Sequence, residues 1–291
     1  MPWLKSCVRS KTMAWQIPIL SDRLFEKFAV FIYGLCGIQL SISKKTMLTS
    51  RLVSRLRALS MDSFDDYYEY VTSAAGRVEQ VDMIDAVSTN KTDFFREDDH
   101  FSFLTDFILS LRAKDKAGDG NPFHIWSAGC SSGEEPYTMG MVLSEYARVH
   151  PRFDFKIVAT DISTRILDRA RAGIYKDSKV AAIPKNLVRR YLLKGGGSNT
   201  GQHRIVPELQ DKIDFKRVNF IDERFSLTTS FDVIFCRNVI IYFDRKTQND
   251  LFKKFYHHLK SGGYFFLGHS EMMSEMVPGF EKIEPTVYRK L

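Results

Sequence analysis

The chain has 291 residues, of which 44% are hydrophobic and 26% are charged, and its formal net charge is +7. This is the composition of an ordinary globular protein, and it excludes a disordered chain, a collagen-like repeat and a disulfide-dense mini-protein. The longest apolar run, residues 29–38, is too short to span a bilayer, which takes about 20 residues.

The positive charge is concentrated near the N-terminus. Residues 1–60 contain ten Lys and Arg but only two Asp and Glu, whereas the remaining residues sum to −1. Such asymmetry indicates an acidic partner, namely a nucleic acid, an anionic membrane or an acidic protein surface, or else a solvated helix face. The four cysteines are scattered, and the first 20 residues lack the apolar core of a signal peptide, so we expect a cytoplasmic protein.

Apolar periodicity predicts helices over residues 21–37, 44–59, 63–70 and 78–87. Ser21 is suited to cap the first of them, and Gly37 is suited to end it. The second helix has an apolar stripe, and Arg51, Arg55 and Arg57 lie off that stripe. Part of this helix therefore presents a basic face.

From residue 123 onward, short apolar segments alternate with helical patterns. We predict strands over residues 124–128, 155–160, 213–218, 231–236, 264–267 and 286–289, and helices over residues 136–149, 163–171 and 246–259. Such alternation is typical of a parallel α/β sheet. Residues 176–212 interrupt it with a helical patch, a glycine loop and a short extended piece, which we interpret as a small inserted subdomain.

A loop of small residues, 127–136, follows the first strand and opens a helix. It lacks the G-x-G-x-x-G pattern of dinucleotide sites, and Glu134 and Glu135 would repel a pyrophosphate. These carboxylates suit a cationic ligand, or they only interact favourably with the helix dipole. Asp161 ends the second strand, where a carboxylate accepts hydrogen bonds from ribose hydroxyls or caps the next helix. A nucleoside with a sulfonium and an amino-acid tail, S-adenosylmethionine, would satisfy both features.

Three further segments are less informative by themselves. Residues 88–96 form a polar linker with an aromatic anchor, to which we assign no chemistry on its own. Cys236 is either a nucleophile or a buried, inert thiol, and the absence of a preceding Pro favours the second interpretation. His269 is either a general base or a residue without a catalytic role, and the sequence offers no clear partner for it.

Together, five segments resemble the CheR family of chemotaxis receptor methyltransferases, in the same order and with matching spacing. They are N-x-T-x-F-F-R at residues 90–96, W-S-A-G-C-S-S-G-E-E-P-Y at 126–137, A-T-D-I at 159–162, F-C-R-N-V-I-I-Y-F-D at 235–244 and G-H-S-E at 268–271. The resemblance covers about residues 20–290.

The resemblance implies a doubly wound, mostly parallel, Rossmann-like methyltransferase sheet with an N-terminal all-helical domain and a small inserted antiparallel β-subdomain. We expect the helical domain over residues 21–88 and the methyltransferase domain over 89–291, with the insertion at 176–212. Residues 1–20 form an extension to which we assign no role.

The implied activity is transfer of a methyl group from S-adenosylmethionine to glutamate side chains of methyl-accepting chemotaxis receptors. A glutamate is already ionised at pH 7, since its reference pKa is about 4.3, so it needs no general base. Catalysis would come mostly from positioning and from removing water, and no metal is expected. Arg96 and Arg237 would orient a carboxylate, and Tyr242 would lie near the transferred methyl. The implied cofactor contacts are Asn90, Thr92, Arg96, Glu135, Asp161, Asn219, Phe220, Arg237 and Asn238.

The resemblance also implies two docking surfaces. Arg51, Arg55 and Arg57 would contact the acidic helical bundle of the receptor. The loop of Gly195, Gly197 and Gly201 either binds a receptor's C-terminal tail by strand addition or is a simple hairpin. Two alternatives stay open. An RNA or DNA methyltransferase would share the cofactor domain and explain the basic N-terminus. A non-catalytic adaptor would bind the cofactor as a structural element only.

Overall fold

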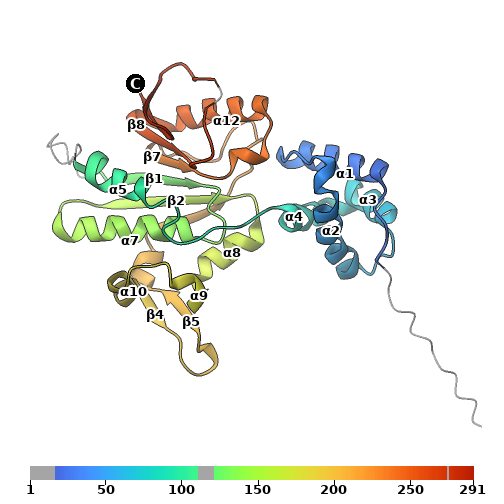
Figure 1. Cartoon of the computed structure of the whole chain (residues 1–291), viewed down its shortest axis with the longest axis horizontal. Helices are drawn as coiled ribbons and strands as arrows, with labels where there is room; N and C mark the ends of the chain where they lie inside the picture. The colour runs from blue at the N-terminus through green and yellow to red at the C-terminus, as the bar shows by residue number, and fades with distance from the viewer. Residues whose placement is uncertain (1–16, 111–120, 274) are drawn as a thin grey trace, which may run out of the picture.

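A computed structural model describes residues 17–110, 121–273 and 275–291. They form a helical N-terminal domain and an α/β domain, joined by an extended segment around residues 88–93 (Figure 1). Residues 1–16, which make up most of the expected extension, lie outside the described residues. Within the described part of the chain, no helix combines the length and apolar character needed to cross a membrane.

The N-terminal domain contains the four helices predicted from periodicity, with ends within two residues of those expected. They are α1 (Asp22–Cys36), α2 (Lys45–Leu59), α3 (Phe64–Thr72) and α4 (Arg77–Val87). Ser21 caps α1 by accepting a hydrogen bond from the Leu24 N–H, and Gly37 ends it with a φ of 74°. The apolar faces of the four helices, including the fully buried Phe28 and Leu52, form one core.

The α/β domain is built on a seven-stranded sheet with the order β6-β2-β1-β7-β8-β10-β9. Its strands are β1 (Phe123–Ala128), β2 (Phe155–Asp161), β6 (Ile213–Arg217), β7 (Phe231–Cys236), β8 (Leu259–Leu267), β9 (Phe280–Glu284) and β10 (Val287–Lys290). The first five in spatial order are parallel, and the last two pair antiparallel. The chain order reverses between β1 and β7, and ligands of such sheets bind outside the carboxyl ends of the strands at this point.

Helices cover both faces of the sheet. The longer ones are α7 (Glu134–Val149), α8 (Thr164–Ala172) and α12 (Arg245–His258), and a further turn of helix, α5 (Asp99–Phe103), continues as a π-helical segment over Leu104–Leu109. One core lies between the sheet, α7 and the 94–109 region, and the other lies under α12. We did not predict α5 or β9, but the mostly parallel, doubly wound fold is confirmed.

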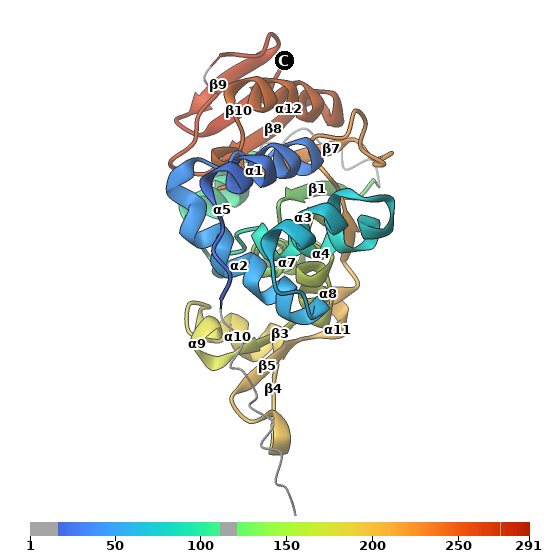
Figure 2. The ribbon, with the colours of Figure 1, turned by 90° about the vertical axis from the view of Figure 1, so that its right-hand side faces the viewer.

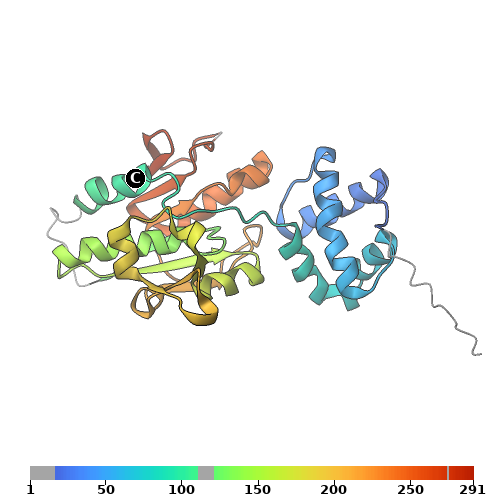
Figure 3. The ribbon, with the colours of Figure 1, turned by 60° about the horizontal axis from the view of Figure 1, so that its bottom comes forward.

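The inserted region forms the expected small antiparallel sheet, which projects below the main body in Figure 1 and lies in front of it in Figure 3. Its strands are β3 (Ile174–Lys176), β4 (Leu192–Lys194) and β5 (Gln202–Ile205), in the order β3-β5-β4, and its short helices are α9 (Asp177–Val180), α10 (Lys185–Tyr191) and α11 (Pro207–Gln210). The expected helical patch at 187–193 is wrong at its end, because Leu192 and Leu193 already pair with β5. The glycine loop connects β4 to β5.

Candidate active site

A cavity of about 310 Å³ lies between the helical domain and the α/β domain. Figure 2 shows the helices of the N-terminal domain in front of the α/β domain. Its walls combine residues 36–47 and 87–96 with the loops that follow β1, β2, β6 and β7. The structure brings ten predicted site residues together in its lining: Asn90, Thr92, Arg96, Glu135, Asp161, Asn219, Phe220, Arg237, Asn238 and Tyr242.

The loop after β1 is held in its shape by glycine and by Asp161. Gly129 has a φ of 86°, and a Cβ there would lie 2.4 Å from Val239 Cγ2, so this backbone approaches the loop after β7 as only glycine allows. Asp161 accepts hydrogen bonds from the backbone N–H groups of Ser131 and Ser163, at 2.9 and 3.0 Å. Burial raises the pKa of Asp161, although these N–H groups act in the opposite direction. The cap of α8 itself is Ser163.

Glu135 and Arg237 form a buried ion pair in the cavity wall. The Glu135 carboxylate accepts a hydrogen bond from Ser127 Oγ at 2.7 Å, and its other oxygen lies 3.0 Å from Arg237 Nε. The Arg237 guanidinium also donates to the carbonyl oxygens of Arg96 and Glu97, at 2.5 and 3.4 Å, and this residue is only 6% exposed. These contacts favour a positioning role for Arg237 over direct contact with a substrate carboxylate. The Arg96 side chain is 38% exposed, and its role toward a substrate carboxylate stays a prediction.

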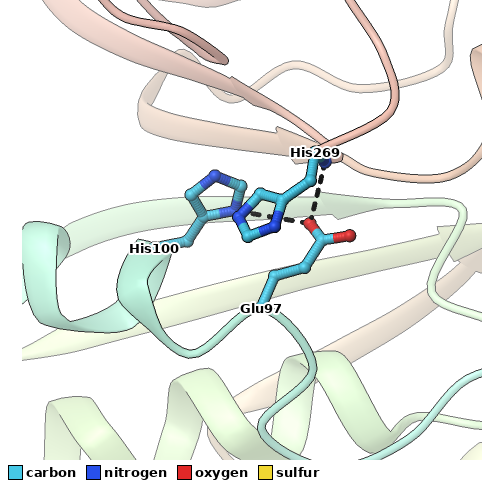
Figure 4. A group of neighbouring side chains, drawn as sticks. All are labelled: Glu97, His100 and His269. Atoms are coloured by element: carbon cyan, nitrogen blue, oxygen red, sulfur yellow. Dashed lines mark hydrogen bonds and ion pairs between the residues drawn. The ribbon is translucent and has the colours of Figure 1, made fainter.

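Beneath this wall, Glu97 lies between His100 and His269, and the three offer ligand atoms within 4.8 Å of one another (Figure 4). Arg237 Nη1 lies 3.2 Å from His100 Nδ1, and Arg237 Nε lies 3.8 Å from the Glu97 carboxylate. The guanidinium thus balances the charge of Glu97 and would repel a cation. Burial and the neighbouring Arg237 lower the pKa of His100 to about 4, so this imidazole is neutral at pH 7. The cluster is best explained as a charge-balanced support of the cavity wall.

Two contacts join the helical domain to the site. Asn219 donates from its amide to the carbonyl oxygen of Leu35 at 2.7 Å, and the Gln39 N–H donates to the carbonyl oxygen of Tyr242 at 2.9 Å. Asn219 therefore fixes the end of α1 against the sheet in addition to lining the cavity. The helical domain is consequently a wall of the site.

Two residues considered in the sequence have no place in the cavity lining. Cys236 is fully buried, and burial raises its pKa well above the ordinary value, which agrees with the inert thiol that we favoured. His269 is half-exposed and its ring pairs with Asp99 at 3.0 Å. Neither residue is placed to act as a nucleophile or a general base at this site.

The predicted basic docking face is largely occupied by internal contacts. Arg55 donates to the Glu79 carboxylate at 2.8 and 2.7 Å and lies 2.9 Å from Asp82, while Arg51 donates to the carbonyl oxygens of Val87 and Ser88. Of the three predicted arginines, only Arg57 is exposed. Long-range partners of this kind leave no signal in the sequence. Arg51 and Arg55 therefore hold the helical domain and its linker together, and their part in receptor docking stays a prediction.

Sequence reasoning missed other lining residues. Lys44 and Lys91 are exposed and line the cavity, so two cations that we had not singled out flank it. Ser131 also lines it, and its buried Oγ has no hydrogen-bond partner among the described residues. The signal for Ser131 was present, because it lies in the small-residue loop. Lys44 precedes the basic helix by one residue, but nothing local places it at a cavity.

Comparison with known proteins decides the family. A model described as the SAM-binding domain of CheR methyltransferases matches residues 90–289, and one described as their all-alpha domain matches residues 23–88. The chain belongs to the CheR methyltransferase family. A chemotaxis protein methyltransferase of Borreliella burgdorferi is 41% identical over 94% of this chain and 96% of the relative. Its counterpart in Salmonella typhimurium is 38% identical over 92% of this chain and 90% of that relative.

These matches confirm the resemblance seen in the five motifs. As a member of the CheR family, the chain is an S-adenosylmethionine-dependent methyltransferase of chemotaxis. Four features of the cavity fit this cofactor. It is in the size range of small-molecule sites, about 300–1,000 Å³. It has carboxylates for a cationic ligand, and it contains the orphaned Ser131 hydroxyl and the close glycine approach at Gly129. The alternatives of a nucleic-acid methyltransferase and a non-catalytic adaptor gain no support.

Proposed function

We propose that the chain acts in the cytoplasm and methylates glutamate side-chain carboxylates of chemotaxis receptors, forming methyl esters. One observation carries the proposal, namely the division of charge within the cavity. The acidic group of Asp161 is buried in its wall and that of Glu135 is only 12% exposed, whereas the basic groups of Lys44, Lys91 and Arg96 are exposed or partly exposed. The first set favours a cationic nucleoside inside, and the second set favours an approaching carboxylate.

S-adenosylmethionine, when bound, supplies an electrophilic methyl group on a sulfonium. Asp161 and Glu135 would hold its polar groups, together with Asn90, Thr92, Asn219, Phe220 and Asn238. Arg96 orients the substrate carboxylate by charge-assisted hydrogen bonds. Tyr242 lines the same cavity from the loop after β7, and in this proposal its hydroxyl donates to the reacting carboxylate. Because that carboxylate is already ionised, the residues contribute orientation and exclusion of water rather than proton transfer.

The exposed basic residues Lys44, Lys91 and Arg57 would face the acidic receptor bundle and guide the substrate to the site.

A second contact involves the inserted sheet. β4 is an edge strand, Leu193 on it is 53% exposed, and the loop of Gly195, Gly197 and Gly201 follows directly. An edge strand presents backbone groups to which an extended receptor tail adds as a further strand.

The proposal is tested with S-adenosylmethionine labelled on its methyl group and membranes that contain receptors. Label on protein that mild base releases as volatile methanol would support a carboxyl ester. Base-stable label on protein would exclude glutamate as the target, and label on added nucleic acid alone would restore the rival enzyme. Tyr242→Phe should lower kcat while the Kd for S-adenosylhomocysteine changes little, and Tyr70→Phe, at a part-buried position of α3 outside the cavity lining, serves as the matched control.

A further inference from the structure

The inserted subdomain contacts two segments of the cofactor cavity, although it lines none of it itself. Lys179, on α9, donates from Nζ to the carbonyl oxygen of Thr92 and to the Asp93 carboxylate, the latter at 2.6 Å. The same Nζ lies 3.6 Å from the carboxylate of Glu134, at the start of α7. Thr92 lines the cavity, and Glu134 precedes Glu135, which also lines it.

Tyr175, on β3, makes a second connection between the same two segments. Its hydroxyl donates to the carbonyl oxygen of Ser132 at 2.6 Å, and its ring packs edge-on against Phe94 with 4.8 Å between ring centroids. Tyr175 is only 6% exposed. A Cβ at Gly133 would lie 2.9 Å from the Tyr175 hydroxyl oxygen, so the loop before α7 is shaped around this side chain. The inserted subdomain thus contacts two segments, residues 92–94 and residues 132–134, which are some 40 positions apart in the chain.

Among the subdomain's contacts with these two segments, the one made by Lys179 matters most, because it lies between two carboxylates. Glu134 is almost fully buried, with 2% of its side chain exposed, whereas Asp93 is half-exposed. Burial raises the pKa of Glu134; the Ser132 hydroxyl and the positive charge of Lys179 act in the opposite direction, and the negative charge of Asp93 adds to the effect of burial. Without Lys179, the two carboxylates would repel each other, and this repulsion would push the linker that carries Thr92 away from the start of α7.

We propose that Lys179 is a positioning residue for S-adenosylmethionine, which keeps Thr92 and the start of α7 at the separation that the cofactor requires. The inserted subdomain is then part of the scaffold of the cofactor site, in addition to any contact with a receptor. This inference deepens the proposed function, on which it rests only for the identity of the bound nucleoside.

The test measures binding of S-adenosylhomocysteine to the full chain by titration calorimetry, without any receptor. We expect Lys179→Met to weaken binding about tenfold, as for the loss of a charge-assisted contact. The matched control is Lys185→Met, an exposed change in the same subdomain, which should bind as the wild type does. Lys179→Arg should restore most of the affinity. The difference between Lys179→Met and the wild type should shrink at high salt, because the interaction is electrostatic and partly exposed.

A second variant keeps the test decisive if Lys179→Met folds poorly. Asp93→Asn in the Lys179→Met background removes the repulsion and should recover part of the affinity. An unchanged Kd in Lys179→Met, or a lost affinity that neither Lys179→Arg nor Asp93→Asn improves, would overturn the proposal. Because no receptor is present, these outcomes are independent of which carboxylate is methylated.

Discussion

Replacing Arg55 with Met tests whether this side chain stabilises the helical domain or contacts a receptor. Arg55 makes two hydrogen bonds to Glu79, which is only 4% exposed. Opposite charges about 2.7 Å apart attract by about 6 kcal/mol at an effective dielectric constant of about 20, and much of this gain offsets desolvation. Removing one partner of a buried pair costs about 3–5 kcal/mol. The Tyr67 hydroxyl still donates to Glu79 at 2.8 Å, so we expect the lower end, about 3 kcal/mol.

The assay is urea unfolding followed by far-ultraviolet circular dichroism. Arg23→Met, a change of the same kind at an exposed position of α1, should alter the free energy of unfolding by no more than about 0.5 kcal/mol. Glu79→Gln added to Arg55→Met should recover much of the lost stability, because no unpaired charge then remains buried and the Tyr67 hydroxyl keeps an acceptor. If Arg55→Met has the same free energy of unfolding as the wild type and instead raises KM for the receptor, the reasoning is refuted and Arg55 is a docking residue.

Three further predictions concern the site. Gly129→Ala should abolish binding of S-adenosylhomocysteine in calorimetry, because its Cβ would clash with Val239 and its φ is positive. The pKa of His100 is about 4 in the folded chain, below its reference value of about 6.5. The wild type therefore loses up to about 3 kcal/mol of stability as the pH falls from about 6.5 to about 4. His100→Gln should flatten that part of the pH profile of the free energy of unfolding. Lys44→Met and Lys91→Met should each raise KM for receptors several-fold at low salt, leave kcat unchanged, and match the wild type at high salt.

Local signals in the sequence predicted most of the fold. Periodicity and the caps at Ser21 and Gly37 located the helices of the N-terminal domain, and alternation of strands and helices predicted the parallel sheet. The helix at 99–109 was missed because it is a short α-helical turn that continues as a π-helix, without a cap signal. β9 was missed because it is an edge strand whose pairing with β10 is set by tertiary contact.

The residues of the candidate site likewise differ in whether local signals in the sequence predicted them. Asp161 and Glu135 were predicted from their positions at a strand end and a helix start, where the fold itself directs side chains to a ligand. Asn90 and Thr92 came only from the family resemblance, because an extended linker carries no periodicity. The engagement of Arg55 by Glu79, 24 residues away, depends on the packing of α2 against α4 and has no local signature.

The hydrogen bonds from Asn219 to Leu35 and from Gln39 to Tyr242 place the cavity where one domain closes on the other. A ligand enclosed there couples the unfolding of the two domains, since neither can open without releasing it. At a concentration one hundred times its Kd, such a ligand adds about 2.7 kcal/mol to the stability of the folded chain. The supply of methyl donor would then govern how long the protein survives proteolysis in the cell as well as how fast it works.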